Sequence, residues 1–232
     1  EAIAEFDKAL EIDPTPAPHH YHRGVALLKL GRFNDAIAAF DKTLSLTPGY
    51  APAFYQKGLA LHAIGMNQDS VEAFDRSLEL DSNLPEAALN KAIALHDLGR
   101  NEESLAACEN ALELKPDYIE ASFQKGKTLV ELERFDQAVD AFDRTIELDP
   151  TTAQTHYDKG LALIHLGRYL EAVASFDRLL EMIPGYAPAF FHKGRALAQV
   201  GMYNEAVFAY NINLEITPDD PEVLYHKGIA LA

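Results

Sequence analysis

The stretch YHRGVALLKLGRFNDAIAAFDKTLSLTP, residues 21–48, decides the fold. Its first half is rich in small and aliphatic residues and stops at Gly31, the residue type that most often follows the last turn of a helix. Its second half repeats apolar residues at i, i+3/i+4 and i+7, which is typical of an amphipathic helix. That half stops before Pro48, which cannot continue a helix. The stretch therefore predicts two helices joined by a short turn.

The same pattern returns along the whole chain at a fixed period. Glycine, with one alanine, forms a ladder with a step of 34 (58 − 24): Gly24, Gly58, Ala92, Gly126, Gly160, Gly194 and Gly228. The heptapeptide PGYAPAF also occurs twice, at 48–54 and 184–190, and its second copy starts four periods after the first (184 − 48 = 4 × 34). A fixed period of this length indicates a repeat architecture. We divide the chain into a partial repeat 1–16, full repeats 17–50, 51–84, 85–118, 119–152, 153–186 and 187–220, and a partial repeat 221–232.

Small residues explain how the two helices of a repeat can pack. When each full repeat is numbered from 1 to 34, position 8 belongs to the glycine ladder and position 20 is always Ala or Ser. Two helices approach closely only where both lack bulk, so we expect a close contact at these positions. Position 24 is Phe or Tyr in five of the full repeats and fills the space beside the contact; Cys108 replaces the aromatic residue in the repeat 85–118.

This set of positions resembles the tetratricopeptide repeat (TPR) family. The family pattern has the same period, with small residues at positions 8, 20 and 27, an aromatic residue at 24 and proline at 32. The resemblance implies an all-α, right-handed superhelical solenoid of antiparallel helix pairs, with 1–232 as a single solenoid and the first helices lining a concave groove. Position 27 departs from the pattern, because Leu179 and Asn213 are large for that site.

Composition and motifs narrow the function. The formal net charge of −16 argues against nucleic acid as a partner, since phosphate binding needs clustered cations. No apolar run approaches the ~20 residues that span a bilayer, so we expect no membrane contact and a cytoplasmic location. There is no nucleophile, base or metal-ligand motif, and the histidines at 19–22 have no cysteine partner. We therefore expect no enzyme activity, no metal and no cofactor.

The resemblance implies that the chain binds a protein or peptide in the groove, which the family builds at positions 2, 5, 6, 9, 12 and 13. Position 5 is an almost unbroken aromatic column, position 6 can always form hydrogen bonds, and position 9 is mostly aliphatic with two isolated cations. The candidate binding residues are Tyr21, Tyr55, Gln56, Leu59, Asn90, Ile93, Phe123, Gln124, Lys127, Tyr157, Asp158, Phe191, His192 and Arg195.

Two interpretations of these columns stay open. The aromatic residues either pack between neighbouring repeats or form side pockets, while position 6 is either solvated or binds a ligand's backbone. A similar asparagine ladder binds peptide backbone in the TPR portion of O-GlcNAc transferase. The carboxylate clamp of TPR co-chaperones is not expected, because only Asn90 fits it.

Charges also repeat. Position 7 is always Lys or Arg and position 25 is mostly Asp, so we expect these columns to form ion pairs, and favour pairs across repeats over pairs within one. The chain starts and stops inside repeats, which predicts weak end-to-end self-association. The expected function is a non-enzymatic protein-binding scaffold. The alternatives are a regulatory or substrate-binding arm of a larger enzyme whose catalytic domain lies outside this chain, and a structural spacer.

Overall fold

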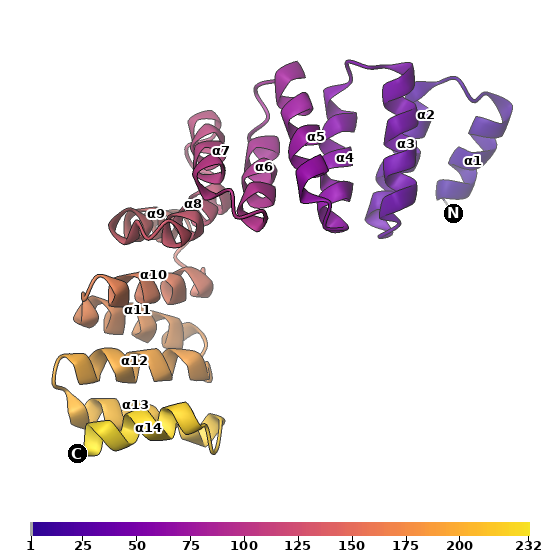
Figure 1. The fold of residues 1–232 in the computed structure, drawn as a ribbon. Coiled ribbons are helices and arrows are strands. Elements are labelled where there is room, and N and C mark those ends of the chain that lie inside the picture. Colours follow the sequence, from indigo (N-terminus) through magenta and orange to yellow (C-terminus); the bar gives the residue numbers. More distant parts are fainter. Residues whose placement is uncertain (1) are drawn as a thin grey trace. The chain divides into compact units, whose positions relative to one another are not determined.

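The computed structural model describes residues 2–232, and over these residues the fold is all-α, with fourteen helices and no strand (Figure 1). The helices are α1 (Ala2–Ile12), α2 (Ala17–Lys29), α3 (Phe33–Leu46), α4 (Ala51–Ala63), α5 (Asn67–Leu80), α6 (Pro85–Asp97), α7 (Asn101–Leu114), α8 (Ile119–Glu131), α9 (Phe135–Leu148), α10 (Ala153–His165), α11 (Tyr169–Met182), α12 (Ala187–Gln199), α13 (Tyr203–Ile216) and α14 (Pro221–Leu231). Each full repeat holds two of them, as the sequence predicts.

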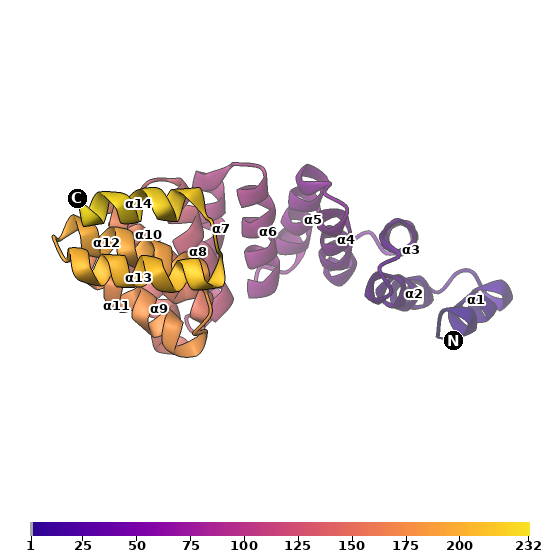
Figure 2. The ribbon, with the colours of Figure 1, turned by 90° about the horizontal axis from the view of Figure 1, so that it is seen from below.

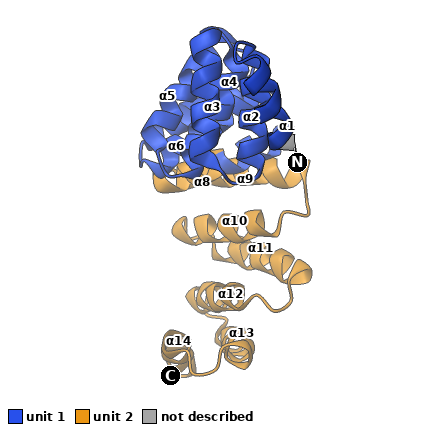
Figure 3. Ribbon diagram, turned by 90° about the vertical axis from the view of Figure 1, so that its right-hand side faces the viewer, with its two compact units in different colours: residues 1–124 blue, residues 125–232 orange. Residues whose placement is uncertain are grey.

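The chain forms two compact units, one ending at Gln124 and one beginning at Lys125 (Figure 3). The boundary falls within α8, where the repeat register continues without a break. In the first unit the helices up to α7 follow one another in chain order, and in the second unit α9 to α14 do the same (Figures 1 and 2). The single solenoid over 1–232 stays a prediction.

Each unit has a tighter face, formed by the first helices of the repeats. First helices of neighbouring repeats contact one another: α2 with α4 and α4 with α6 in one unit, and α10 with α12 and α12 with α14 in the other. Between the described second helices of neighbouring repeats within a unit there is no such contact. Spacing is therefore closer on the side of the first helices. We call that side the inner face and the side of the second helices the outer face.

Glycine at position 8 lets the two helices of a repeat approach, as predicted. A Cβ atom on Gly58 would lie 2.6 Å from the ring of Phe74 at position 24, much closer than two carbon atoms pack. The same contact recurs between Gly24 and Phe40 and between Gly160 and Phe176. The ring thus occupies the space that a side chain at position 8 would need.

The repeat 85–118 solves the same packing problem with different residues. Ala92 has the Cβ atom that its counterparts lack, and Cys108 has no ring to collide with it; both are fully buried. Ser104 at position 20 donates a hydrogen bond of 2.7 Å to the Ala92 carbonyl, just as Ser70 donates one of 2.8 Å to the Gly58 carbonyl. Ala92 and Cys108, which depart from the pattern in the same repeat, therefore compensate each other: a larger residue at position 8 is matched by a smaller one at position 24.

Position 27 accommodates its two large residues in different ways. Asn213 is buried and donates a hydrogen bond of 2.6 Å to the carbonyl of Ala187, at the start of its own repeat. Ser77 makes the equivalent bond to Ala51 at 3.0 Å, so the amide of Asn213 replaces a hydroxyl. Leu179 is buried in the core and needs no partner. The departure from the family pattern leaves the helix pairs intact.

The charged columns at positions 7 and 25 pair across repeat boundaries, which confirms the favoured alternative. The ammonium of Lys91 lies 2.5 Å from the carboxylate of Asp75 in the preceding repeat. The same pairing joins Arg23 to Asp7, Lys57 to Asp41, Lys159 to Asp143 and Lys193 to Asp177. Because the cations are largely covered while the carboxylates are about half exposed, these pairs help to fix the register between neighbouring repeats.

The turn between the two helices of each repeat needs one residue in the left-handed backbone conformation, with positive φ. Five of these turns use glycine, with φ between 70° and 78°, but Glu133 takes this place in the fourth full repeat with φ of 55°. A side chain in this region costs ~1–2 kcal/mol, whereas glycine loses more entropy on folding, by ~0.5–1 kcal/mol. The conformation at Glu133 is therefore strained relative to its five counterparts.

We expect Glu133→Gly to stabilise the protein by roughly 0.5–1 kcal/mol, which would raise the thermal midpoint by about 1–4 °C. Thermal unfolding followed by circular dichroism measures this. The matched control is Gly65→Ala at the equivalent turn, where φ is 78°, and this variant should lower the midpoint. A lower midpoint for Glu133→Gly would contradict the argument.

Candidate peptide-binding face

The aromatic column at position 5 lies on the inner face and packs in two directions. The ring of Tyr55 lies 6.0 Å from that of Phe74 in the same repeat, and Tyr157 makes the same contact with Phe176. Tyr157 also meets His192 at position 6 of the next repeat, with ring centroids 5.8 Å apart. The aromatic residues therefore pack between repeats, as one of the two interpretations held.

This packing leaves part of each ring accessible. Tyr21, Tyr55, Phe123, Tyr157 and Phe191 are all partly buried. Burial raises the pKa of the tyrosines Tyr21, Tyr55 and Tyr157, which keeps their hydroxyl groups neutral. Such rings present an apolar surface with a polar edge to a ligand.

Position 6 is not a uniform polar ladder, because its members have different surroundings. Asn90 donates a hydrogen bond of 2.7 Å to the Glu86 carbonyl and a longer one of 3.4 Å to the Tyr55 hydroxyl. Gln56 is partly buried, and Gln124 is buried on α8. The side-chain amide of Asn90 is therefore already hydrogen-bonded to its own helix and to the preceding repeat.

His192 sits among aromatic rings and stays neutral. Its ring packs against Phe176 at 6.1 Å and Phe191 at 5.1 Å. Burial, together with the nearby charge of Arg195, lowers the pKa of His192 to about 4. Its Nδ1 atom is buried and has no hydrogen-bond partner among the described residues. This histidine is a packing group with one spare polar atom.

Position 9 combines aliphatic residues with two cations. Leu59 and Ile93 are partly buried in the first unit. In the second unit Lys127 is partly buried, whereas Arg195 is exposed and lies 5.6 Å over the ring of Phe191 on the same helix. This cation–π contact holds Arg195 above the aromatic column.

Lys127 and Asp158 meet at a small pocket of the second unit. The pocket has a volume of about 140 Å³, and Phe142 and Leu161 also line it. Burial raises the pKa of the Asp158 carboxyl, while a hydrogen bond of 3.0 Å from Gln154 and the charge of Lys127 act in the opposite direction. The two charges face one cavity, yet no direct ion pair joins them in the described part of the chain. Both retain hydrogen-bonding capacity for a ligand.

The histidines form no metal site in the structure. Among residues 2–232 there is no group of three or more His, Cys, Asp or Glu side chains that could hold a metal ion. His62 instead pairs across the repeat boundary with Asp97, with Nε2 and the carboxylate oxygen 2.9 Å apart. Among the described residues, no helix has the length and apolar character that crossing a membrane requires.

One feature of the outer face escaped the sequence analysis. A pocket of about 520 Å³ lies between α11, α12 and α13, and an equivalent pocket of about 400 Å³ lies four repeats earlier. A comparison of repeat positions 22 and 26 could have found the difference between them: these positions are Glu72 and Arg76 in the earlier repeat but Phe208 and Ile212 in the later one.

Pairs of helices that recur at a fixed period define an α-helical repeat protein. The sequence profile of the tetratricopeptide repeat family matches residues 1–51, 21–85, 55–119 and 123–187, which is more than half of the chain. The chain therefore belongs to the tetratricopeptide repeat family and is an all-α TPR solenoid. Proteins of this family bind proteins or peptides, and the family is generally non-catalytic. No curated protein matches the chain.

Solved structures share the fold at low sequence identity. YrrB, described as a TPR protein with an unusual peptide-binding site, is 24% identical, with 82% of this chain and 98% of YrrB covered and a TM-score of 0.74. The C-terminal part of a TPR repeat-containing protein from Cytophaga hutchinsonii is 15% identical, with coverages of 97% and 92% and a TM-score of 0.82. MamA from Desulfovibrio magneticus RS-1 is 18% identical, with coverages of 74% and 97% and a TM-score of 0.69. These likenesses show the fold alone.

Proposed function

We propose that the chain is a non-enzymatic scaffold whose inner face binds an extended peptide segment of a partner protein. The observation that carries this proposal is the pocket that Lys127 and Asp158 line together with Phe142 and Leu161. An ammonium and a carboxylate so placed can bind a carbonyl oxygen and an N–H group of the same peptide. Phe142 and Leu161, which line the same cavity, suit an aliphatic or aromatic ligand side chain.

The spacing of the inner face favours an extended ligand. Packed helices lie ~8–10 Å apart, and an extended chain advances ~3.3 Å per residue. Each rung of the stack would then meet about every third ligand residue. Between rungs, the partly buried rings at position 5 offer apolar contacts. An acidic C-terminal tail is not required, because position 5 carries aromatic or leucine side chains where the family's carboxylate clamp has lysine.

The aromatic titratable groups of this face suit packing against a bound peptide. Burial raises the pKa of Tyr55 and Tyr157 and lowers that of His192, and each shift favours the neutral form. Neutral aromatic groups contribute packing and hydrogen bonds to a bound peptide. The cytoplasmic location and the absence of nucleic-acid partners stay predictions from the sequence.

A peptide library tests the proposal. Twelve-residue peptides displayed on phage would be selected on the purified chain, and the affinities of the selected peptides measured by fluorescence anisotropy. We expect enrichment of apolar and aromatic residues, and a loss of about tenfold or more in affinity when Lys127→Ala and Asp158→Ala are combined, because both backbone contacts are removed. The double substitution leaves the net charge unchanged.

The control is Arg144→Ala with Glu147→Ala, which removes an exposed ion pair of α9 in the same unit at equal net charge. It should bind the selected peptides like the wild type. Two results would refute the proposal: a selection in which no class of peptides loses affinity for the Lys127/Asp158 variant, or a selection that yields only acidic C-terminal tails.

A further inference from the structure

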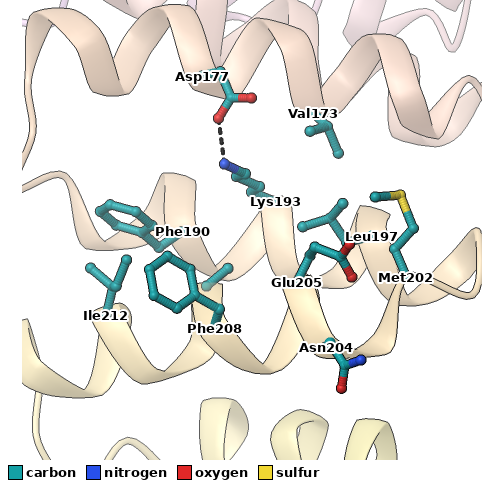
Figure 4. Close-up of a pocket in the computed structure, with 11 residues that line it drawn as sticks. Val173, Asp177, Phe190, Lys193, Leu197, Met202, Asn204, Glu205, Phe208 and Ile212 are labelled. Atoms are coloured by element: carbon teal, nitrogen blue, oxygen red, sulfur yellow. Dashed lines mark hydrogen bonds and ion pairs between the residues drawn. The ribbon is translucent and has the colours of Figure 1, made fainter.

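The outer-face pocket of the repeat 187–220 is lined by large apolar side chains that its counterpart in the repeat 51–84 lacks. Figure 4 shows Phe190 and Phe208 side by side, with Ile212 next to them on α13. Phe208 is 66% exposed although it is a large apolar residue. At the same position, the other full repeats carry Ala38, Glu72, Ala106, Asp140 and Ala174. Among the full repeats, only the repeat 187–220 therefore carries a large apolar side chain at this position.

The equivalent pocket four repeats earlier has a charged side chain at this place. There Phe54 replaces Phe190 at the same repeat position, and the guanidinium of Arg76 lies 6.0 Å over its ring. Arg76 also pairs with Glu79 on the same helix. In the later pocket Ile212 stands in place of Arg76, so Phe190 has no cation above it from this position. Helix α13 therefore carries apolar residues, Phe208 and Ile212, at the two positions where α5 carries the charged residues Glu72 and Arg76.

The rim of the later pocket is acidic. On the floor, Lys193 is neutralised by Asp177, with 2.5 Å between ammonium and carboxylate. Glu205 lines the pocket, is exposed and has no ion-pair partner among the described residues. Helix α13 carries Glu205 and Glu215 and no lysine or arginine. The site therefore combines an apolar centre with uncompensated negative charge.

We propose that this pocket, between α11, α12 and α13, docks a segment of a partner protein that presents an aliphatic or aromatic side chain next to a lysine or arginine. The apolar side chain packs on Phe190, Phe208 and Ile212, and the cation pairs with Glu205. Its volume of about 520 Å³ lies within the range of ~300–1,000 Å³ typical of ligand pockets. Charge argues against a second copy as the occupant, because the chain carries a net charge of −16 and copies repel one another.

This site is separate from the proposed peptide-binding surface of the inner face. Phe190 and Phe208 lie at repeat positions 4 and 22, whereas the inner-face residues occupy positions 5, 6 and 9. Each of the two proposals can therefore be refuted without affecting the other. Peptides that dock here should not respond to Lys127→Ala with Asp158→Ala.

The repeat 51–84 supplies the test variant. Phe208→Glu with Ile212→Arg installs the pair found in the earlier pocket, at equal net charge. From the phage library of twelve-residue peptides we expect a class with an apolar residue beside Lys or Arg. Anisotropy should show at least about tenfold weaker binding of this class to the double variant. Glu205→Gln should reduce both the affinity and its dependence on salt. Circular dichroism should show all variants folded like the wild type.

The reverse exchange gives a gain of function. Glu72→Phe with Arg76→Ile should create a second site for the same peptides, seen as a doubled stoichiometry in calorimetry. The proposal is overturned if no such class is selected, or if its peptides bind the Phe208/Ile212 variant like the wild type. It is equally overturned if wild-type sedimentation shows a dimer that this variant abolishes, since a second copy would then be the occupant.

Discussion

Replacing Gly58 by leucine is expected to lower the thermal midpoint of the protein by roughly 2–12 °C. A Cβ atom alone would lie 2.6 Å from the ring of Phe74, and leucine adds three further carbon atoms. Phe74 is fully buried and cannot swing into solvent. Overpacking of a filled core lowers the free energy of unfolding by ~1–3 kcal/mol and sometimes more. In a chain of this size, each kcal/mol lowers the thermal midpoint by ~2–4 °C.

The glycine ladder contains its own control for this experiment. Gly228 occupies the same repeat position on α14, but a Cβ atom there would meet nothing within 4 Å. Gly228→Ala should leave the midpoint unchanged or raise it slightly, because alanine favours a helix over glycine by ~0.8–1 kcal/mol. Thermal unfolding of both variants separates the packing effect from helix propensity. Equal midpoints for Gly58→Leu and the wild type would show that the contact does not limit packing.

Much of the fold follows from the sequence because its determinants are local and recur in register. Gly24 and Gly31 mark a close contact and a turn, and Pro48 marks a helix end. Each signal depends on the backbone conformations that glycine and proline allow, and these can be predicted from a single sequence. The recurrence of these signals at a fixed period also set the repeat boundaries, and every full repeat holds its two helices within them.

The candidate site was less predictable because its properties depend on contacts between repeats. Tyr157 and His192 belong to neighbouring repeats, yet their rings pack together. The sequence identifies an aromatic and a polar column, but not that burial keeps His192 neutral. For the same reason the sequence only favoured pairing across repeats, which the Lys91–Asp75 pair shows, over pairing within one repeat. Only the packing of one repeat on the next decides such questions.

The outer pocket shows a different limit. Phe208 and Ile212 fit the apolar periodicity of a second helix, so by themselves they look like core residues. Only alignment of repeat positions 22 and 26 reveals that other repeats carry small, polar or charged residues there. Within a repeat protein, the other repeats serve as references for each position. A residue that departs from its own column is a better indicator of a site than its type alone.

Cys108→Phe is expected to destabilise the protein although the five other full repeats carry an aromatic residue at this position. In those repeats the ring packs against glycine, whereas Ala92 has a Cβ atom in the repeat 85–118. Both Ala92 and Cys108 are fully buried, so neither side chain can move aside without cost. We expect a loss of about 1–3 kcal/mol from overpacking, measured as a lower thermal midpoint.

Adding Ala92→Gly should reverse most of this loss. The double variant recreates the contact seen between Gly58 and Phe74, where the ring fills the space above the glycine. Ala92→Gly alone should destabilise the protein by ~0.5–1 kcal/mol, since it loses helix propensity and leaves space unfilled. The two single losses would then be non-additive, with a favourable coupling of roughly 1–3 kcal/mol in a double-mutant cycle. Additive losses would mean that Ala92 and Cys108 do not compensate each other, and that the ring at position 24 does not require glycine at position 8.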